Sequence, residues 1–343
     1  MPRARKFLAV ILSAWVAVGG PLGAQQPRKT PPDDDPRVRI RTRVELVVVP
    51  VTVKDARGNL IHDVRQDEFR VFEDDVEQEV QLFSTDTFPL SVVVLIDNAL
   101  PQRVSREVEQ SARAIAAAFG EFDEVSLALF EAYYEPVLDF TSDNDKLYDV
   151  LKRLKLGGYF PGQASPAMTS PPRVNTGPPL EPRVPTTVPR TGRRDKNLYD
   201  ALYAAAEQLR TRSRERRKVI LLISDGVAAR SNTFNFDDSI KQLLSSDISV
   251  YAIGVGDAQL NRITSVLGRY SRSTGGDVFY AGSRSELESL YPRVTEQART
   301  QYTLAYVPRG NNRTLSYHSI EVRIRRANLS LLARDGYFVV NVP

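Results

Sequence analysis

The sequence predicts an α/β protein with a doubly wound, mostly parallel six-stranded sheet and a small flanking β-sandwich built from both ends of the chain. From residue 90 onward, apolar β-branched runs of strand length alternate with longer segments of helical periodicity. This pattern is typical of parallel strands that are covered on both faces by helices. A repeated strand and helix order gives a right-handed doubly wound sheet.

The predicted α/β domain comprises residues 88–300. Its strands are expected at residues 91–96, 125–130, 219–224, 249–255 and 277–280, with 135–140 as an antiparallel edge strand. Its helices are expected at residues 105–119, 145–154, 197–212, 237–245, 260–271 and 285–298. A chain of 343 residues can bury one large core here and a second, smaller core elsewhere.

Short strands flank this domain on both sides. The N-terminal β unit, residues 38–87, contains a β-branched run in which Pro50 predicts an edge strand or a bulge, because proline cannot donate a ladder hydrogen bond. The C-terminal segment, residues 301–343, has strands of similar length and alternation. We expect the two to join into one β-sandwich, since the early strands could not bury a core alone.

Three segments are expected to lie outside both cores. Residues 1–24 have the basic start, short apolar run and small residues of a signal peptide, and residues 25–37 form a polar, proline-rich linker. The apolar run is shorter than the roughly 20 residues of a membrane span, so we expect cleavage, with an uncleaved anchor as the alternative. Residues 157–195 contain nine prolines and are expected to form a disordered surface insertion, or alternatively a partner-contacting loop.

The composition excludes several classes of function. The 46 basic residues face 42 acidic ones, so a nucleic-acid partner is not expected. The absence of cysteine excludes disulfides, thiolate metal sites and a lipid-modified cysteine. We expect a periplasmic or secreted protein without a transmembrane segment in the mature chain.

Two aspartates follow strands of the predicted sheet, where ligands of open α/β sheets bind. Asp97 closes the run 92–96, and Asp225 closes the run 219–224. Two neighbouring carboxylates repel each other unless a cation or a proton lies between them. The plainer alternative is that each aspartate caps a neighbouring helix by accepting backbone N–H bonds.

Four segments resemble von Willebrand factor type A domains in their order and spacing. They are Val94–Asp97, Asn197–Leu202, Leu222–Gly226 and Tyr251–Gly256. The flanking segments Asp67–Asp74, Gln301–Tyr306 and Arg334–Tyr337 are similar to a bacterial VWFA-related family best known from Acidobacteria. The resemblance implies an exported protein in which a β unit is assembled around the A domain.

Type A domains often carry a metal-ion-dependent adhesion site, in which Asp-x-Ser-x-Ser, a threonine and a second aspartate hold Mg²⁺ or Mn²⁺ through oxygen atoms. Here Ala99 and Pro101 occupy the two serine positions after Asp97, and Lys196 aligns near the threonine. We hypothesise that the Lys196 ammonium supplies the charge that a metal supplies elsewhere. No cofactor is therefore expected, and the alternative is Mg²⁺ or Mn²⁺ held by Asp97 and Asp225.

The remaining candidates are aromatic and amide side chains. Tyr133 and Tyr134 are expected in a loop, the setting of many binding hot spots, and Asn98 joins the candidate ligand-binding set of Asp97, Lys196 and Asp225. The two histidines, His62 and His318, are expected to be solvated strand or loop residues.

The sequence thus predicts a binding module and not an enzyme, since neither a nucleophile elbow nor a dinucleotide motif is present. The expected partner is another exported or cell-envelope protein, and the oligomeric state is left open. The alternatives are metal-dependent adhesion through Asp97 and Asp225, and an exported hydrolase that uses the same carboxylates.

Overall fold

The structure is a computed structural model that describes residues 46–157, 196–260, 265–309 and 316–339. The predicted signal peptide, the linker and the insertion beyond Gly157 lie outside the described residues. Among the helices that are described, none is long and apolar enough to cross a membrane.

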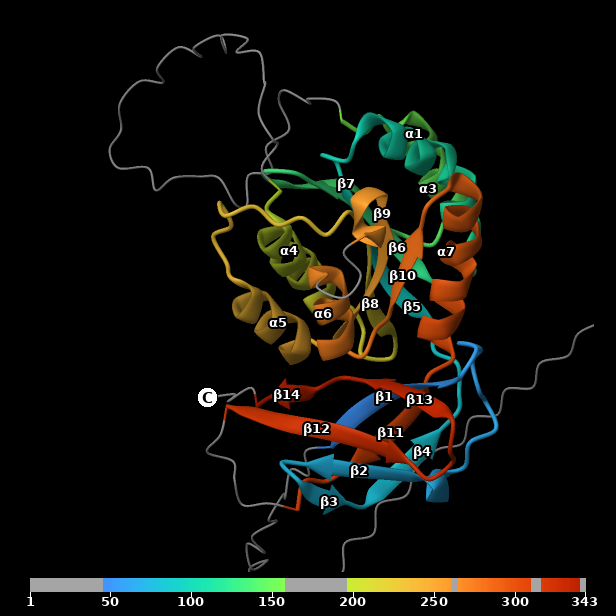
Figure 1. Cartoon of the computed structure of the whole chain (residues 1–343), viewed down its shortest axis with the longest axis vertical. Helices are drawn as coiled ribbons and strands as arrows, with labels where there is room; N and C mark the ends of the chain where they lie inside the picture. The colour runs from blue at the N-terminus through green and yellow to red at the C-terminus, as the bar shows by residue number, and fades with distance from the viewer. Residues whose placement is uncertain (1–45, 158–195, 261–264, 310–315, 340–343) are drawn as a thin grey trace, which may run out of the picture. The chain divides into compact units, whose positions relative to one another are not determined.

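Six strands form the central sheet, in the order β10-β9-β8-β5-β6-β7 (Figure 1). They are β5 (Leu90–Asp97), β6 (Glu124–Phe130), β7 (Tyr134–Thr141), β8 (Arg217–Ser224), β9 (Ile248–Val255) and β10 (Val278–Ala281). All neighbours are parallel except β7, which pairs antiparallel with β6 at the edge. The predicted fold class, including the antiparallel edge strand, is therefore confirmed.

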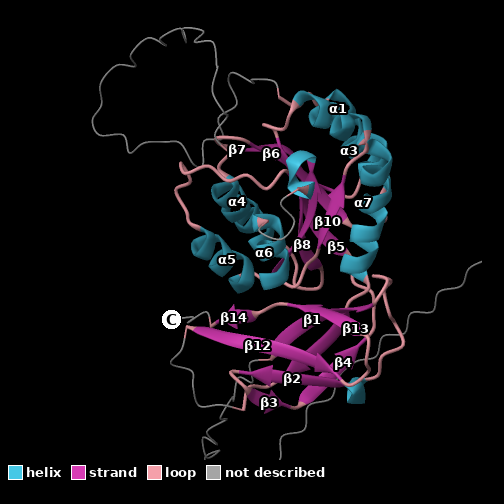
Figure 2. Ribbon diagram, in the orientation of Figure 1, coloured by secondary structure: helices cyan, strands magenta, loops and turns pink. Residues whose placement is uncertain are grey.

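Helices cover both faces of this sheet (Figure 2). One face carries α1 (Gln102–Gln110), α2 (Ala112–Ala117), α3 (Asn144–Arg153) and α7 (Arg284–Arg299). The other carries α4 (Leu198–Arg210), α5 (Phe236–Ser245) and α6 (Val266–Ser273). Alternate residues of β5 enter the two cores: Val92 and Val94 pack on the first side, and Val93 and Leu95 on the second.

Two helix predictions were wrong in their bounds. The expected helix 105–119 is broken at Ser111, whose hydroxyl donates to the Val108 carbonyl at 2.7 Å and contacts the Tyr291 hydroxyl at 2.8 Å. Such a side-chain bond competes with the helical ladder. The expected helix 260–271 begins only at Val266, because Ser265 caps it by accepting from the Leu267 N–H group. A short 3-10 helix, η2 (Gly256–Gln259), follows β9 instead.

The flanking β unit consists of two four-stranded antiparallel sheets, in the orders β13-β1-β11-β4 and β14-β12-β2-β3. The strands are β1 (Val47–Asp55), β2 (Phe69–Glu73), β3 (Val76–Gln78), β4 (Val80–Ser84), β11 (Tyr302–Tyr306), β12 (Tyr317–Ile324), β13 (Leu329–Ala333) and β14 (Gly336–Phe338), with a 3-10 turn, η1 (Gln66–Glu68), before β2. Each sheet mixes strands from both ends of the chain. Their inner faces share one core, with Val49, Val71 and Leu304 among the residues fully removed from solvent.

Pro50 does not mark an edge strand or a bulge, as its sequence context predicted. Strand β1 lies inside its sheet, and Pro50 is in regular register with Thr303 of β11. On its other side β1 pairs with β13 only from Val51 onward. The proline therefore sits in the half of the strand that has one neighbour, where a missing N–H group costs no ladder bond.

The sandwich contacts the α/β domain at the amino ends of the parallel strands. Arg217, the first residue of β8, donates from Nη2 to the Gln301 carbonyl at 2.7 Å and to the Thr303 hydroxyl at 3.1 Å. Arg334, which follows β13, donates to Asp247 at 2.6 Å, one residue before β9 begins. The carboxyl ends of the same strands, where the candidate site lies, are at the opposite edge of the sheet.

Candidate functional site

Three charged side chains from distant parts of the chain meet at the carboxyl edge of the sheet. Asp97 is the last residue of β5, Asp225 follows β8, and Lys196 lies just before α4. The Lys196 ammonium donates to Asp97 Oδ2 at 2.9 Å and to Asp225 Oδ2 at 2.6 Å. The ammonium therefore lies between the two carboxylates.

Each carboxylate is also held by its own loop. Asp97 Oδ1 accepts from the Ala99 N–H group at 2.8 Å, and Asp97 Oδ2 accepts from the Ser224 hydroxyl at 2.9 Å. Asp225 Oδ1 accepts from the Val227 N–H group at 3.0 Å. The two backbone contacts are turn contacts two residues along the chain, and the Ser224 hydroxyl belongs to the neighbouring strand β8. The alternative that the aspartates cap helices is therefore wrong.

The helices that follow the two strands have other N-caps. Pro101 precedes α1, and Asn235 caps α5 by accepting from the Asp238 N–H group at 2.9 Å. Gly226 makes the turn after Asp225 with a φ of +76°, and a Cβ atom there would lie 3.0 Å from Leu267 Cγ. A larger residue would therefore be strained at this position.

The backbone around Lys196 fastens two further loops to the site. The Lys196 carbonyl accepts from the Ala229 N–H group at 2.8 Å, in the loop after β8. The next residue, Asn197, donates from its backbone to the Glu131 carbonyl at 2.8 Å and from Nδ2 to the Ala132 carbonyl at 2.9 Å. Lys196 is thus placed by contacts to the β6–β7 turn and to the β8–α5 loop.

The three side chains of the site are almost completely buried. The side-chain exposure is 0% for Asp97, 8% for Lys196 and 11% for Asp225. Burial raises the pKa of the Asp97 carboxyl, the Lys196 ammonium opposes this shift, and the Asp225 carboxylate adds to it. One ammonium cannot neutralise two carboxylates, so the fully ionised cluster has a net charge of −1.

The described residues do not fit the metal-ion-dependent adhesion site of the type A family. Ala99 and Pro101 offer no side-chain oxygen, and the volume between the two carboxylates is taken by an ammonium group at hydrogen-bonding distance from both. A divalent ion there would face the positive charge of Lys196 with too few oxygen ligands. In the structure the Lys196 ammonium occupies the position between the two carboxylates.

The other predicted site residues lie around this cluster but do not enter it. Asn98 is buried, and its Oδ1 accepts from the Gly157 N–H group at 2.8 Å, at the start of the predicted insertion. Tyr133 lies in the β6–β7 turn with 73% of its surface exposed. Tyr134 is not a loop residue as predicted: it begins β7, and its hydroxyl donates to Gln208 Oε1 of α4.

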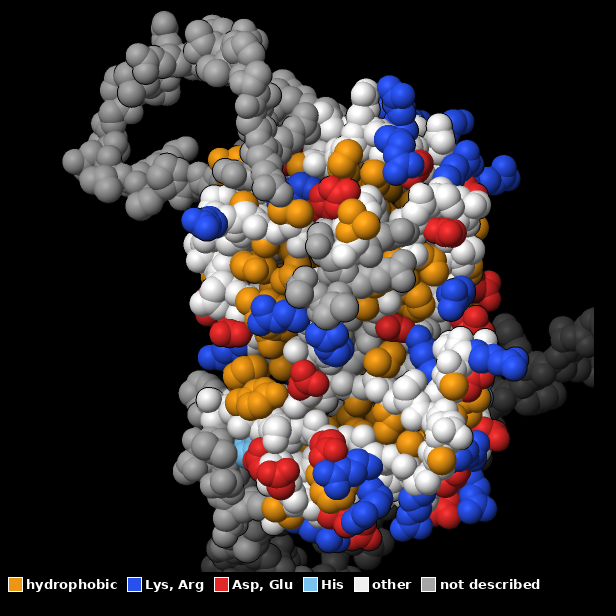
Figure 3. Space-filling model, viewed as in Figure 1, with side chains coloured by type: hydrophobic (Ala, Val, Ile, Leu, Met, Phe, Trp, Pro, Cys, Tyr) orange, Lys and Arg blue, Asp and Glu red, His pale blue; other side chains and the backbone are white. Residues whose placement is uncertain are grey.

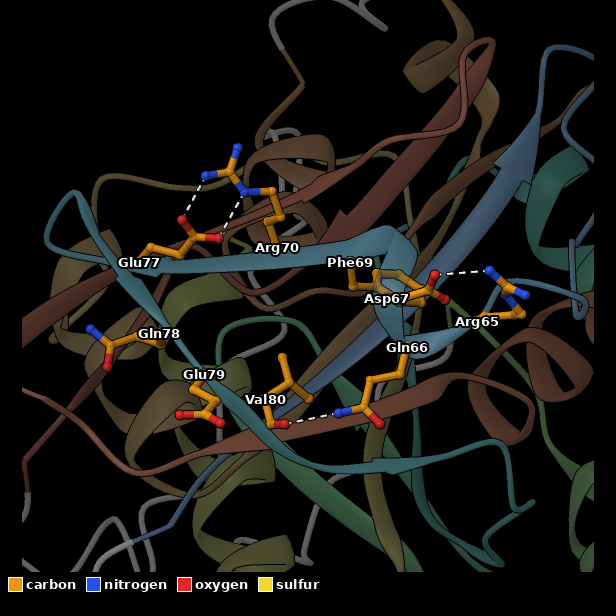
Figure 4. A pocket seen from close by; sticks show the side chains of 9 residues that line it. All are labelled: Arg65, Gln66, Asp67, Phe69, Arg70, Glu77, Gln78, Glu79 and Val80. Atoms are coloured by element: carbon orange, nitrogen blue, oxygen red, sulfur yellow. Dashed lines mark hydrogen bonds and ion pairs between the residues drawn. The ribbon is translucent and has the colours of Figure 1, made fainter.

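The open groove on the sandwich is a weaker candidate (Figure 4). Its polar side chains bind one another: Arg70 donates to Glu77 at 2.7 and 2.6 Å, and Gln66 donates to the Val80 carbonyl at 2.8 Å. The lining residues are Arg65, Gln66, Asp67, Phe69, Arg70, Glu77, Gln78, Glu79 and Val80. Groups that are already paired leave little for a ligand to bind.

The sequence prediction for His318 was wrong. The His318 side chain is only 6% exposed, and its Nδ1 atom lies 2.7 Å from Asp74 Oδ2. Alternation along β12 could have indicated an inward-facing position, but the partner carboxylate is 244 residues away in the sequence. His62, in contrast, is exposed as expected.

Residues 184–293 match the family model of the von Willebrand factor type A domain. The chain therefore contains a domain of this family, as its motifs predicted, and the match runs from the segment before α4 into α7. Strand β5 with Asp97 lies before the matched part. The comparison with curated proteins gives no match.

Several solved structures match this chain at low sequence identity. A von Willebrand factor type A protein from Catenulispora acidiphila is 8% identical over 88% of this chain and 76% of its own, with a TM-score of 0.44. Proximal thread matrix protein 1 from the mussel byssus, with zinc in its adhesion motif, is 14% identical over 63% of this chain, with a TM-score of 0.41. BatB from Bacteroides thetaiotaomicron is 14% identical, with a TM-score of 0.41, and the match covers 61% of this chain and 98% of BatB. The present chain spans about half, 49%, of the mussel protein.

Replacing Lys196 by methionine tests the importance of the buried cation. Lys196→Met leaves Asp97 and Asp225 buried without their partner, so we expect a loss of about 3–5 kcal/mol in the free energy of unfolding. The control is Lys155→Met, because Lys155 is 73% exposed and forms only a surface ion pair with Glu109. That variant should change stability by less than about 0.5 kcal/mol in urea denaturation. Equal effects of the two substitutions would contradict the assignment.

The raised pKa of Asp97 predicts a pH dependence. The pKa of this carboxyl is 3.8 in the unfolded chain and higher in the native protein. There is therefore a range of pH in which the native protein still holds the proton and the unfolded chain has released it. The contribution of Asp97 to stability therefore falls as the pH rises above about 4 and levels off above the native pKa. Asp97→Asn lacks this contribution. The free energies of unfolding of wild type and variant are measured by urea denaturation across this pH range. The wild-type value minus the variant value should decrease as the pH rises, and a constant or growing difference would contradict the raised pKa.

Proposed function

We propose that this chain is an exported interaction module whose type A domain recognises another protein through the loops at the carboxyl edge of its sheet, without a metal ion. Domains of this family generally serve adhesion or interaction. The observation that carries the proposal is the position of the Lys196 ammonium, 2.9 Å from Asp97 and 2.6 Å from Asp225. An ammonium group that bonds to both carboxylates can hold the two loops together without an added cation.

The candidate contact surface is formed by exposed side chains around this cluster. Tyr133 is 73% exposed after β6, and Leu260 is 85% exposed after η2, at the same edge of the sheet. Tyrosine is among the residue types enriched in binding hot spots, which makes Tyr133 the stronger candidate of the two. The buried triad of Asp97, Lys196 and Asp225 supports the loops, while Tyr133 would touch the partner.

The charge distribution favours a protein partner over a nucleic acid. On the face drawn in Figure 3, basic and acidic side chains of the described residues are interspersed. A nucleic-acid-binding surface would be expected to collect basic residues in one stripe or patch. Export is proposed from the first 24 residues of the sequence, which have the charge and apolar pattern of a signal peptide.

The binding proposal can be tested by affinity capture from the cell envelope with EDTA present throughout. We expect wild-type bait to retain a specific partner, and Tyr133→Ser to lose most of it. The control is Phe122→Ser, because Phe122 is equally exposed, at 71%, but lies just before β6 at the amino edge of the sheet. It should retain the partner.

Three results would contradict the proposal. In a parallel capture with Mg²⁺ in place of EDTA, a partner that is retained only with Mg²⁺ and is lost in Asp225→Asn would support metal-dependent adhesion. Equal capture by Tyr133→Ser and wild type would remove the carboxyl edge as the contact surface. Substrate turnover that Asp97→Asn or Asp225→Asn abolishes would support the hydrolase alternative.

A triple substitution should convert the site to metal dependence. Ala99→Ser, Pro101→Ser and Lys196→Thr together restore three side-chain oxygens and remove the ammonium group. An ion that binds only the native state raises its melting temperature, so we expect excess Mg²⁺ to raise that of the variant by several degrees over EDTA. Wild-type protein from which bound metal has first been removed should melt at the same temperature in both buffers. If the variant folds but Mg²⁺ does not raise its melting temperature, the hypothesis that Lys196 replaces the ion is contradicted.

A further inference from the structure

A second cluster of charged side chains lies in the β-sandwich, where the β2–β3 hairpin meets β12. Glu73 ends β2, Asp74 is the first residue of the two-residue turn before β3, and His318 is the second residue of β12. The turn is tied to β12 by the Ser319 N–H group and hydroxyl, which donate to Asp74 Oδ1 at 2.9 and 3.1 Å. Asp74 has a φ of +47°, the backbone conformation of a tight hairpin turn.

The three side chains present their ligand atoms to one point. His318 Nδ1 lies 2.7 Å from Asp74 Oδ2 and 3.7 Å from Glu73 Oε1. All three atoms lie within 4.8 Å of one another. In a tetrahedral zinc shell with bonds of about 2.0–2.2 Å, neighbouring ligand atoms are about 3.3 Å apart. The two measured separations lie on either side of that value, so small side-chain movements suffice.

Glu73 is held in a suitable orientation for this role. Its side chain is only 7% exposed, and its Oε2 atom accepts from the hydroxyl groups of Tyr306 at 2.6 Å and Tyr337 at 3.2 Å. Its Oε1 atom lies 3.7 Å from His318 Nδ1. The two tyrosines thus fix one carboxylate oxygen and leave the other directed at the imidazole, as outer contacts do for a metal-bound carboxylate.

The charges of the cluster also favour a bound cation. Within the described part of the chain, His318 is the sole ionic partner of both Glu73 and Asp74. The two carboxylates are adjacent, and a single imidazole can offer them at most one positive charge. A divalent ion would neutralise both, and the tyrosine hydroxyls would act as the outer contacts that orient a metal-bound carboxylate.

We propose that Glu73, Asp74 and His318 form a binding site for one divalent transition-metal ion, and that Zn²⁺ is the ion that fits it best. A mixed set of one imidazole and two carboxylates suits zinc, whereas Mg²⁺ and Ca²⁺ prefer oxygen ligands alone. Asp74 is 34% exposed, which gives the ion access and leaves one position for water. The ion would join the N-terminal hairpin to a C-terminal strand.

The chain has only two histidines, which makes the test direct. Protein freed of its purification tag and of metal is titrated with Zn²⁺ by calorimetry, and its imidazole nitrogens are followed by ¹⁵N NMR. We expect one Zn²⁺ per chain and a large shift of His318 Nδ1, with His62 unchanged. His318→Gln should weaken binding by more than about tenfold, whereas the matched control His62→Gln, at an exposed position, should leave it unchanged.

Any of three results would overturn the proposal: no bound Zn²⁺, unchanged binding in His318→Gln, or an unchanged His318 resonance in the wild type on saturation. If His318→Gln does not fold, Glu73→Gln replaces it, since a glutamine carbonyl can still accept from both tyrosines. The shift of the His318 Nδ1 resonance in the wild type tests the proposal whether or not these variants fold. A failure of this site leaves the Lys196 cluster untouched, because the two lie in separate cores.

Discussion

The loops at the carboxyl ends of the parallel strands depend on one interaction, the pair of hydrogen bonds from the buried Lys196 ammonium to Asp97 and Asp225. A doubly wound sheet buries its central strands on both faces, so polar residues gather where those strands end. β5 is buried along its whole length, and its last residue, Asp97, is completely removed from solvent. A carboxylate in that position needs a cation, and Lys196 provides it while also meeting Asp225.

This arrangement ties the loops together in a way that a solvated cation could not. The lysine is part of the chain, and hydrogen bonds from its own backbone and from Asn197 hold the β8–α5 loop and the β6–β7 turn. The surface that carries Tyr133 is therefore fixed by the same residues that neutralise the buried charge. Preorganised loops lose less entropy on binding, which favours recognition by a rigid surface.

The sandwich meets a similar electrostatic problem with a different set of residues. Glu73 and Asp74 lie side by side with His318 as their ionic partner, and two tyrosine hydroxyls hold only one oxygen of Glu73. The first cluster contains a lysine side chain, whereas the second contains an imidazole, a side chain that often binds metal ions. Two pairs of neighbouring carboxylates in one chain thus have different partners: a lysine in one, and a histidine, with the proposed ion, in the other.

The strand and helix pattern by itself determined the α/β architecture, because periodicity depends on which faces are buried. It also placed Asp97 and Asp225 at one edge, since the carboxyl ends of parallel strands must lie together. Local sequence did not determine the helix break at Ser111, which depends on Tyr291, or the pairing of Pro50, which depends on where β13 starts.

The tertiary structure alone decided which charged groups meet. Lys196 lies 99 residues from Asp97, and His318 lies 244 residues from Asp74. The sequence suggested Lys196 only through its alignment with a family motif, and for His318 it offered no comparable signal. Electrostatic partners act through space at a few ångströms, so their identity depends on how distant segments pack and not on the residues beside them in the chain.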